Sequence, residues 1–264
     1  MERTTTYKPT ILIVNDDGIT APGLANLIEA VADLGEIIVV APDSPQSGMG
    51  HAVTIGNTLR LVKVNLFEEM GIEAYQCSGT PVDCVKMAQD ILLHRKPTIC
   101  LSGINHGSNA SINVIYSGTM SAAMEAAIDG IPAAGFSLQD FRWDADFSIA
   151  KKVVRTVTQQ MLGSHLPENF LVNVNIPKVS EADFKGIKVC RQASAQWKEN
   201  FEKRVDPRGN DYYWMTGKFV NNDMGADSDL ENLKQGYASV VPVKFDLTDE
   251  VVGSWIRRNW EVEE

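Results

Sequence analysis

The sequence has few cysteines and no long apolar segment. It contains four cysteines and no CxxC pair, which predicts buried, reduced thiols rather than a disulfide or zinc framework; they are Cys77, Cys84, Cys100 and Cys190. The first ten residues, MERTTTYKPT, lack the apolar stretch of a secretory signal, and nowhere do about 18 apolar residues run together. We therefore expect a cytoplasmic protein that has no membrane partner.

Positive charge is also scarce. The chain has 24 Lys and Arg residues against 34 Asp and Glu residues, a formal net charge of −10. This balance argues against nucleic acid polymers as the main partner, although a local cationic pocket or a bound metal can still hold one small phosphate. The 264 residues, 44% of them hydrophobic, suffice for one large domain or for a core with an appendage.

The stretch from Ile11 to Gly18, read as ILIVNDDG, contains the first functional signal. Its four aliphatic residues predict a strand buried on both faces, and this strand stops at Asn15, Asp16 and Asp17. Adjacent carboxylates repel each other, so they need a cation, a helix N-terminus or bulk water. At the carboxyl edge of a parallel sheet they favour a metal site, and the alternative is an acidic turn in solvent.

Strand and helix patterns alternate along the first two thirds of the chain. After Pro22 the apolar spacing predicts a helix that stops at Gly35, and IIVVA (37–41) predicts the next buried strand. Thr80, Pro81 and Asp83 form the start signal of a second helix. Further strands are predicted near 52–55, 59–64, 74–77, 98–101, 131–136 and 170–176, and another helix over 150–162. The pattern predicts an α/β fold with a Rossmann-like, doubly wound, mostly parallel sheet.

The alternation fails past residue 177. There the sequence has strand-like pieces at 187–190 and 237–243, an aromatic run at 212–214 and an acidic stretch at 223–231. We therefore expect residues 1–177 to form the catalytic core and residues 178–264 to form a β-rich C-terminal extension that packs back on the core. Exposed hairpins rich in aromatic residues often make oligomer contacts, so this extension is expected to carry them.

Two more loops are expected at the same sheet edge as the acidic pair. The loop PDSPQSGMGHAVTI follows the strand at 37–41 and places Ser47 there, and Asn105 follows the strand at 98–101. Together with Asp16 and Asp17 they offer only oxygen ligands, which suit Mg²⁺ or Mn²⁺ better than zinc or copper. The alternative for Ser47 is an ordinary Ser/Gly turn.

A helix predicted to begin at Ser117-Gly118-Thr119 adds a second kind of site. Its entrance presents free backbone N–H groups, hydroxyl groups and the positive end of the helix dipole, which suit a phosphate; the alternative is an ordinary N-cap. A hard metal beside a phosphate cradle indicates phosphoryl chemistry. A dehydrogenase is disfavoured, because the first strand lacks a glycine-rich turn for a pyrophosphate.

Seven motifs, in order and spanning nearly the whole chain, closely resemble the SurE family of nucleotidases. They are VNDDGITAPGL, the Ser47-Gly48 loop, SGTPVDCV, SGINHGSN, YSGTMSAAMEA, DPRGNDYYW and GYASVVPV. Ala110 stands where the family usually has glycine. The resemblance implies a Rossmann-like core and a C-terminal extension that is exchanged between the subunits of a dimer. It also implies hydrolysis of nucleoside 5′- or 3′-monophosphates, with short polyphosphate as a substrate for some members.

The resemblance further implies one divalent ion per subunit, Mg²⁺ or Mn²⁺, bound by the four ligands Asp16, Asp17, Ser47 and Asn105. The phosphate-contacting residues that it implies are Asn109, Ser117, Gly118 and Thr119.

Several alternatives stay open. Asp16 or Asp17 either orients a water for in-line attack or attacks directly to give an aspartyl-phosphate. His106 or His51 is a candidate acid for the leaving oxygen, although a histidine in a polar loop is more often a hydrogen-bonding bystander. A homodimer and a homotetramer fit equally well. A non-catalytic nucleotide or metal sensor on the same core is the rival function.

Overall fold

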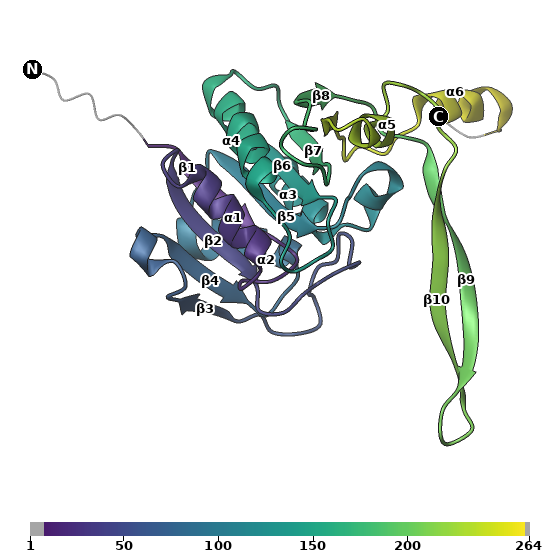
Figure 1. Ribbon diagram of the computed structural model, residues 1–264, viewed down its shortest axis with the longest axis horizontal. Coiled ribbons are helices and arrows are strands. Elements are labelled where there is room, and N and C mark those ends of the chain that lie inside the picture. Colours follow the sequence, from purple (N-terminus) through teal and green to yellow (C-terminus); the bar gives the residue numbers. More distant parts are fainter. Residues whose placement is uncertain (1–7, 262–264) are drawn as a thin grey trace, which may run out of the picture.

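A nine-stranded sheet forms the centre of the computed structural model, which describes residues 8–261 (Figure 1). Its strands lie in the order β3-β4-β2-β1-β5-β6-β7-β11-β8. All neighbouring strands from β4 to β7 pair parallel, β3 pairs antiparallel with β4, and β11 pairs antiparallel with β7. The strands are β1 (Thr10–Val14), β2 (Glu36–Pro42), β3 (Leu61–Val64), β4 (Glu73–Cys77), β5 (Ile99–His106), β6 (Ala133–Leu138), β7 (Leu171–Ile176), β8 (Ile187–Val189) and β11 (Ala238–Pro242). The predicted mostly parallel α/β fold is confirmed.

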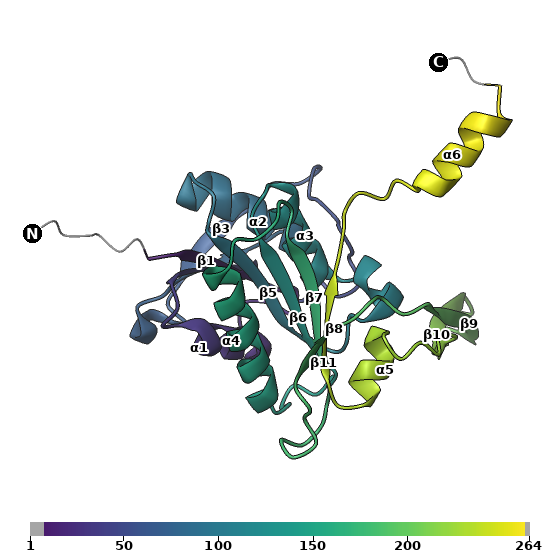
Figure 2. The same cartoon turned by 90° about the horizontal axis from the view of Figure 1, so that it is seen from above.

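Helices cover both faces of the sheet and make three layers (Figure 2). Helices α1 (Pro22–Val31) and α4 (Ser148–Gly163) pack together on one face, and α2 (Pro81–Met87) and α3 (Gly118–Ile128) on the other. Strand β1 feeds both layers, because Ile11 and Ile13 belong to the core under α1 whereas Leu12 belongs to the core under α3. Each such buried side chain contributes about 1.5–3 kcal/mol, so the strand that leads into the acidic pair is firmly held.

The caps of α2 and α3 confirm the predicted helix starts. The Thr80 hydroxyl oxygen accepts the Asp83 N–H at 3.2 Å, and the Asp83 carboxylate accepts the Thr80 N–H at 2.9 Å, which is a complete capping box. The Ser117 hydroxyl oxygen accepts the Met120 N–H at 3.0 Å. Helix α2 then widens into a π-helical turn over Ala88–Leu93.

Two strand predictions differ from the structure. Residues 52–55 form a loop, because the Thr54 N–H bonds to the Asp83 carboxylate at 3.1 Å instead of joining a ladder. The strand predicted to end at residue 101 continues as β5 to His106, with a shift in its pairing to β6 between Ser102 and Asn105. Asn105 is therefore the second-last residue of a paired strand and not part of a free loop.

The chain beyond residue 177 has two kinds of structure. Strands β8 and β11 join the main sheet, whereas β9 (Ala195–Val205) and β10 (Asp211–Asn221) form a two-stranded ribbon that extends away from it (Figure 1). Helix α5 (Asp229–Lys234) packs on β11, and α6 (Glu250–Asn259) stands apart from the sheet (Figure 2). Short 3₁₀ helices occur at Glu68–Met70 and Ser111–Ile115. Among the described residues, no helix is long and apolar enough to span a bilayer.

Candidate functional site

The acidic pair lies where the strand order reverses. From β1 the chain crosses to β2 on one side, and β5 lies against β1 on the other, which is the position where open α/β sheets bind ligands. The His106 N–H at the end of β5 donates to Asp17 Oδ2 at 3.1 Å. The Gln46 N–H donates to the Asp16 carbonyl at 2.8 Å, which ties the backbone just before the exposed Ser47 to the acidic pair.

Helix α3 begins directly against Asp16. The Thr119 hydroxyl donates to Asp16 Oδ1. Gly118 lies so close that a Cβ atom there would be 2.8 Å from the Asp16 Cβ and 3.0 Å from its Oδ2. The α3 N-terminus stabilises negative charge at this point. Glycine at position 118 is thus required by the close approach of the helix to the carboxylate.

Both carboxylates have raised pKa values, which a bound cation would lower. Burial raises the pKa of Asp16 to about 7, and the charge of Asp17 acts in the same direction, whereas hydrogen bonds from Thr119 oppose the shift. Burial also raises the pKa of Asp17, while the His106 N–H opposes the shift. A divalent ion would offset both the burial and the mutual repulsion.

The other predicted ligands fit a hard metal. The Asn105 Nδ2 donates to the Gly107 carbonyl at 2.7 Å, which makes Oδ1 the atom that can serve as a ligand. Within residues 8–261, no three His, Cys, Asp or Glu side chains gather to hold a metal ion. The predicted donor set of two carboxylates, one amide and one hydroxyl would fill four positions of an octahedral ion and leave the others to water and phosphate oxygens.

Asparagines of β7 hold the loop that carries Asn109. Asn175 Oδ1 accepts the Asn109 N–H at 2.8 Å, and Asn173 Nδ2 donates to the Asn109 carbonyl at 2.8 Å. The Asn109 side chain donates to Ser137 Oγ at 2.9 Å. The sequence pattern of residues 170–176, FLVNVNI, predicted only a strand. Two asparagines in an otherwise apolar buried strand were the available signal, because buried amides need partners.

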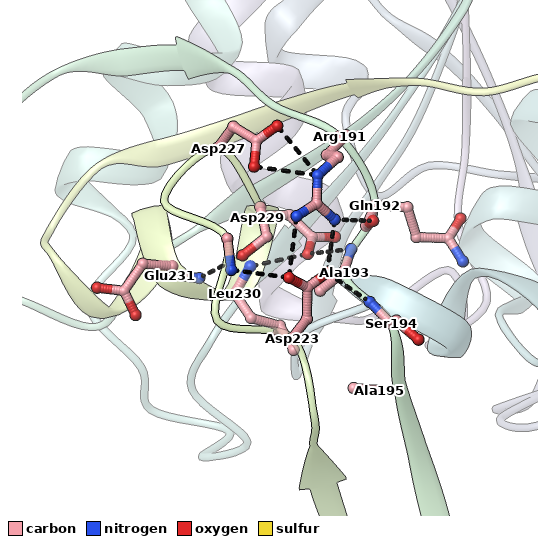
Figure 3. Close-up of polar contacts among 12 residues, drawn as sticks. Arg191, Gln192, Ala193, Ser194, Ala195, Asp223, Asp227, Asp229, Leu230 and Glu231 are labelled. Atoms are coloured by element: carbon pink, nitrogen blue, oxygen red, sulfur yellow. Dashed lines mark hydrogen bonds and ion pairs between the residues drawn. The ribbon is translucent and has the colours of Figure 1, made fainter.

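A second support comes from the C-terminal part of the chain (Figure 3). The fully buried Asp229 accepts the Ser111 N–H at 2.8 Å and the Ala193 N–H at 3.0 Å. The Ser111 hydroxyl donates to the Ala193 carbonyl at 2.7 Å and accepts the Ala195 N–H at 3.2 Å. Ser111 adopts a left-handed φ of 57°, which these bonds hold in place. The base of the ribbon is thus joined to the loop between Asn109 and Ser117.

Ion pairs of Arg191 stabilise the same region, the base of the ribbon, on its exposed side. The Arg191 guanidinium pairs with Asp223 and, at 3.0 Å, with Asp227, and it holds the pKa of the Asp223 carboxyl well below its usual range (Figure 3). Because Arg191 lies in the link between β8 and β9 and Asp223 follows β10, the pair closes the foot of the ribbon. The sequence showed this region only as an acidic stretch.

The two candidate acids have different surroundings. The His106 ring bonds through Nδ1 to the Arg142 carbonyl at 2.8 Å, and its buried Nε2 has no hydrogen-bond partner among the described residues. The His51 ring bonds to the buried Glu125 of α3 at 2.7 Å, and Glu125 also pairs with Lys86. Both assignments stay predictions.

The fold and site place the chain among the α/β proteins that carry an acidic pair and a helix N-terminus at the switch point of a parallel sheet. The chain belongs to the SurE family, because the family model for survival protein SurE matches residues 11–199.

Known relatives extend this match over most of the chain. The 5′-nucleotidase SurE of Christiangramia forsetii is 61% identical over 241 residues, which cover 91% of this chain and 93% of the relative. The 5′-nucleotidase SurE of Cytophaga hutchinsonii is 54% identical over 255 residues, which cover 96% and 98%. The crystal structure of the SurE protein from Aquifex aeolicus superposes with a TM-score of 0.81 at 38% identity, covering 95% of this chain and 99% of the other.

Proposed function

We propose that this nucleotidase removes phosphate from nucleoside 5′- and 3′-monophosphates, with short polyphosphate as a further substrate, in the cytoplasm. The nucleotidase class follows from membership of the SurE family and from relatives named 5′-nucleotidase SurE. The observation that carries the proposal is the pair of adjacent, poorly hydrated carboxylates at the β1 end, with the N-terminus of α3 directly against Asp16. This arrangement accommodates a cation and a phosphate side by side.

In this proposal one divalent ion per subunit, Mg²⁺ or Mn²⁺, is held by Asp16, Asp17, Ser47 and Asn105. The bound metal supplies positive charge for the phosphate and for the leaving ester oxygen. The fit rests on the donor chemistry, because all four side chains offer oxygen and the two carboxylates have raised pKa values.

The chain's own residues position the phosphate and the attacking group. Asn109, Ser117, Gly118 and Thr119 would contact the phosphate through side-chain groups and the N-terminal N–H groups of α3, while the single hydroxyl proton of Thr119 is donated to Asp16. Thr119 also orients Asp16 through its hydroxyl. Asp16 or Asp17 either directs a water in line with the leaving oxygen or attacks phosphorus directly, and phosphate recovered on quenched protein would establish direct attack.

The proton for the leaving oxygen comes from His106 or His51. Because His106 Nδ1 donates to the Arg142 carbonyl, a protonated ring would hold its transferable proton on Nε2. His51 would carry out the same step from the loop of Ser47, where its ring bonds to Glu125 at 2.7 Å.

We further propose that residues 178–264 act as the oligomerisation extension of a core formed by residues 1–177, giving a homodimer or homotetramer. Large apolar side chains are exposed along the ribbon, which supports burial against another copy. They include Trp197, Phe201, Tyr213, Trp214 and Met215.

Hydrolysis of an aryl phosphate and of nucleoside monophosphates tests the proposal. We expect a chelator to abolish turnover and added Mn²⁺ or Mg²⁺ to restore it, because the acidic pair cannot by itself neutralise a phosphate dianion. Binding of a nucleotide without turnover under either metal would favour the rival sensor function and overturn the enzyme.

Metal binding should also be visible in the stability of the protein. Because the folded pKa of Asp16 is raised, its contribution to stability is fully present below its unfolded pKa and is lost as the pH rises through about 7 in the metal-free protein. Protons and the cation compete for the same oxygens. We therefore expect Mn²⁺ to raise Tm more at about pH 8 than at about pH 5.5. An equal rise at both values would place the metal away from this pair.

A further inference from the structure

Two exposed aromatic rings lie next to the end of β5, where the His106 N–H donates to Asp17. Phe141 and Trp143 lie in the loop that follows β6, and their exposed fractions are 81% and 59%. Strand β6 pairs parallel with β5, where His106 is opposite Leu138, so this loop begins at the same sheet edge as the end of β5. Large aromatic rings left in water at the edge of a functional site indicate a binding surface.

The loop is built as a defined structure. The buried Asp140 pairs with Arg142 at 2.8 Å and with Lys178 at 3.1 Å, which fixes the loop at its start. The Trp143 ring is stacked on the His106 ring at 5.5 Å between centroids, with an interplanar angle of 9°. The exposed rings are therefore presented from a fixed backbone.

Phe141 is held by a close approach to glycine. A Cβ atom on Gly107 would lie 2.3 Å from Cε1 of the Phe141 ring, so the ring rests on the Gly107 backbone. Gly107 has a φ of 109°, a conformation that favours glycine. A side chain at position 107 would displace the ring.

Short links join these rings to the predicted metal ligands. The Gly107 carbonyl accepts from Asn105 Nδ2 at 2.7 Å, and the Phe141 ring lies against Gly107. The residue under Trp143, His106, donates its backbone N–H to Asp17. Both rings are thus one residue contact away from a residue that bonds to Asn105 or Asp17.

We propose that Phe141 and Trp143 form the stacking surface for the nucleobase of the substrate. The inference rests on the proposed function and adds to it the residues that distinguish a nucleotide from other phosphate monoesters. A nucleobase offers a flat π face, and aromatic side chains bind such faces with little dependence on base identity. The surface therefore predicts affinity for nucleotides with a broad tolerance of the base.

Paired substrates test this assignment. AMP and ribose 5-phosphate share the phosphate and the sugar and differ in the base, so the ratio of their kcat/KM values isolates the base. We expect Phe141→Ala to lower this ratio by about tenfold, mainly through the KM for AMP, because stacking on one aromatic ring carries an effect of that order. Phe141→Trp should keep the ratio. Trp143→Phe, which preserves stacking on His106, should keep it within about threefold.

Trp260→Ala provides the matched control, because this tryptophan is 56% exposed at the end of α6. Its substrate ratio should equal that of the parent chain. Equal losses for both substrates in Phe141→Ala, or a parent ratio near unity, would overturn the assignment. A changed oligomeric state of Phe141→Ala on size exclusion, with an unchanged ratio, would make the rings a contact between copies. Failure of the parent chain to hydrolyse either substrate would instead overturn the proposed function.

Discussion

Replacing Asp16 with asparagine is expected to lower kcat/KM by about 10³-fold, the scale of losing a central electrostatic group in an active site. The amide keeps the size of the carboxylate and can still accept the Thr119 hydroxyl, so the start of α3 should hold its position. It cannot supply the charge that a divalent ion requires. Asp17→Asn should have an effect of similar size. Steady-state kinetics at saturating Mn²⁺ measure both variants.

The stability of the same variant gives an independent readout. Burial disfavours the ionised form of Asp16, so Asp16→Asn should raise Tm of the metal-free protein at about pH 8, where the parent carboxylate is ionised. Asp90→Asn on the exposed face after α2 is the control and should change neither quantity. Retained activity in Asp16→Asn and Asp17→Asn together would show that the metal binds elsewhere.

Replacing Asp229 with alanine is expected to reduce the free energy of unfolding by about 2–4 kcal/mol. The substitution leaves the N–H groups of Ser111 and Ala193 buried without their acceptor. Ser111 would also lose a restraint on its left-handed φ, which lies two residues after Asn109. We therefore expect a loss of kcat beyond the loss of stability, measured below the unfolding transition. Urea unfolding and kinetics on the same samples separate the two effects.

Asp227→Ala is the matched control for this experiment. Asp227 lies two residues earlier, is exposed and pairs with Arg191. An exposed ion pair of this kind is worth about 0–1 kcal/mol, so this variant should be close to the parent in both measurements. If Asp229→Ala had the same stability and kcat as Asp227→Ala, the hydrogen bonds at Ser111 would not position the loop.

Local sequence signals predicted the parts of the molecule that depend on neighbouring residues. The strand before Asp16, the capping box at Thr80 and the cap at Ser117 each need only a few adjacent residues, and the structure has all three. Topology then gathered Asp17 and Asn105 at one edge, because parallel strands end together. Their role as metal ligands stays a prediction.

The supporting residues could not be predicted in this way. Asp229 bonds to Ser111 across 118 positions of sequence, and Asn175 bonds to Asn109 across 66. No local pattern specifies which loop a buried carboxylate or amide will reach. Phe141 was missed for a related reason, since its significance arises only when β6 is paired beside β5.

The joint at Ser111 also has a thermodynamic consequence. Hydrogen bonds of Asp229 and Ser111 connect the foot of the ribbon to the loop that leads into α3. Suppose that a second subunit binds the ribbon and thereby raises the affinity for nucleotide by some factor. Nucleotide must then raise the affinity between the subunits by the same factor, because linkage is reciprocal. Assembly and substrate occupancy would then report on each other, and a dilution series with and without nucleotide would measure their coupling.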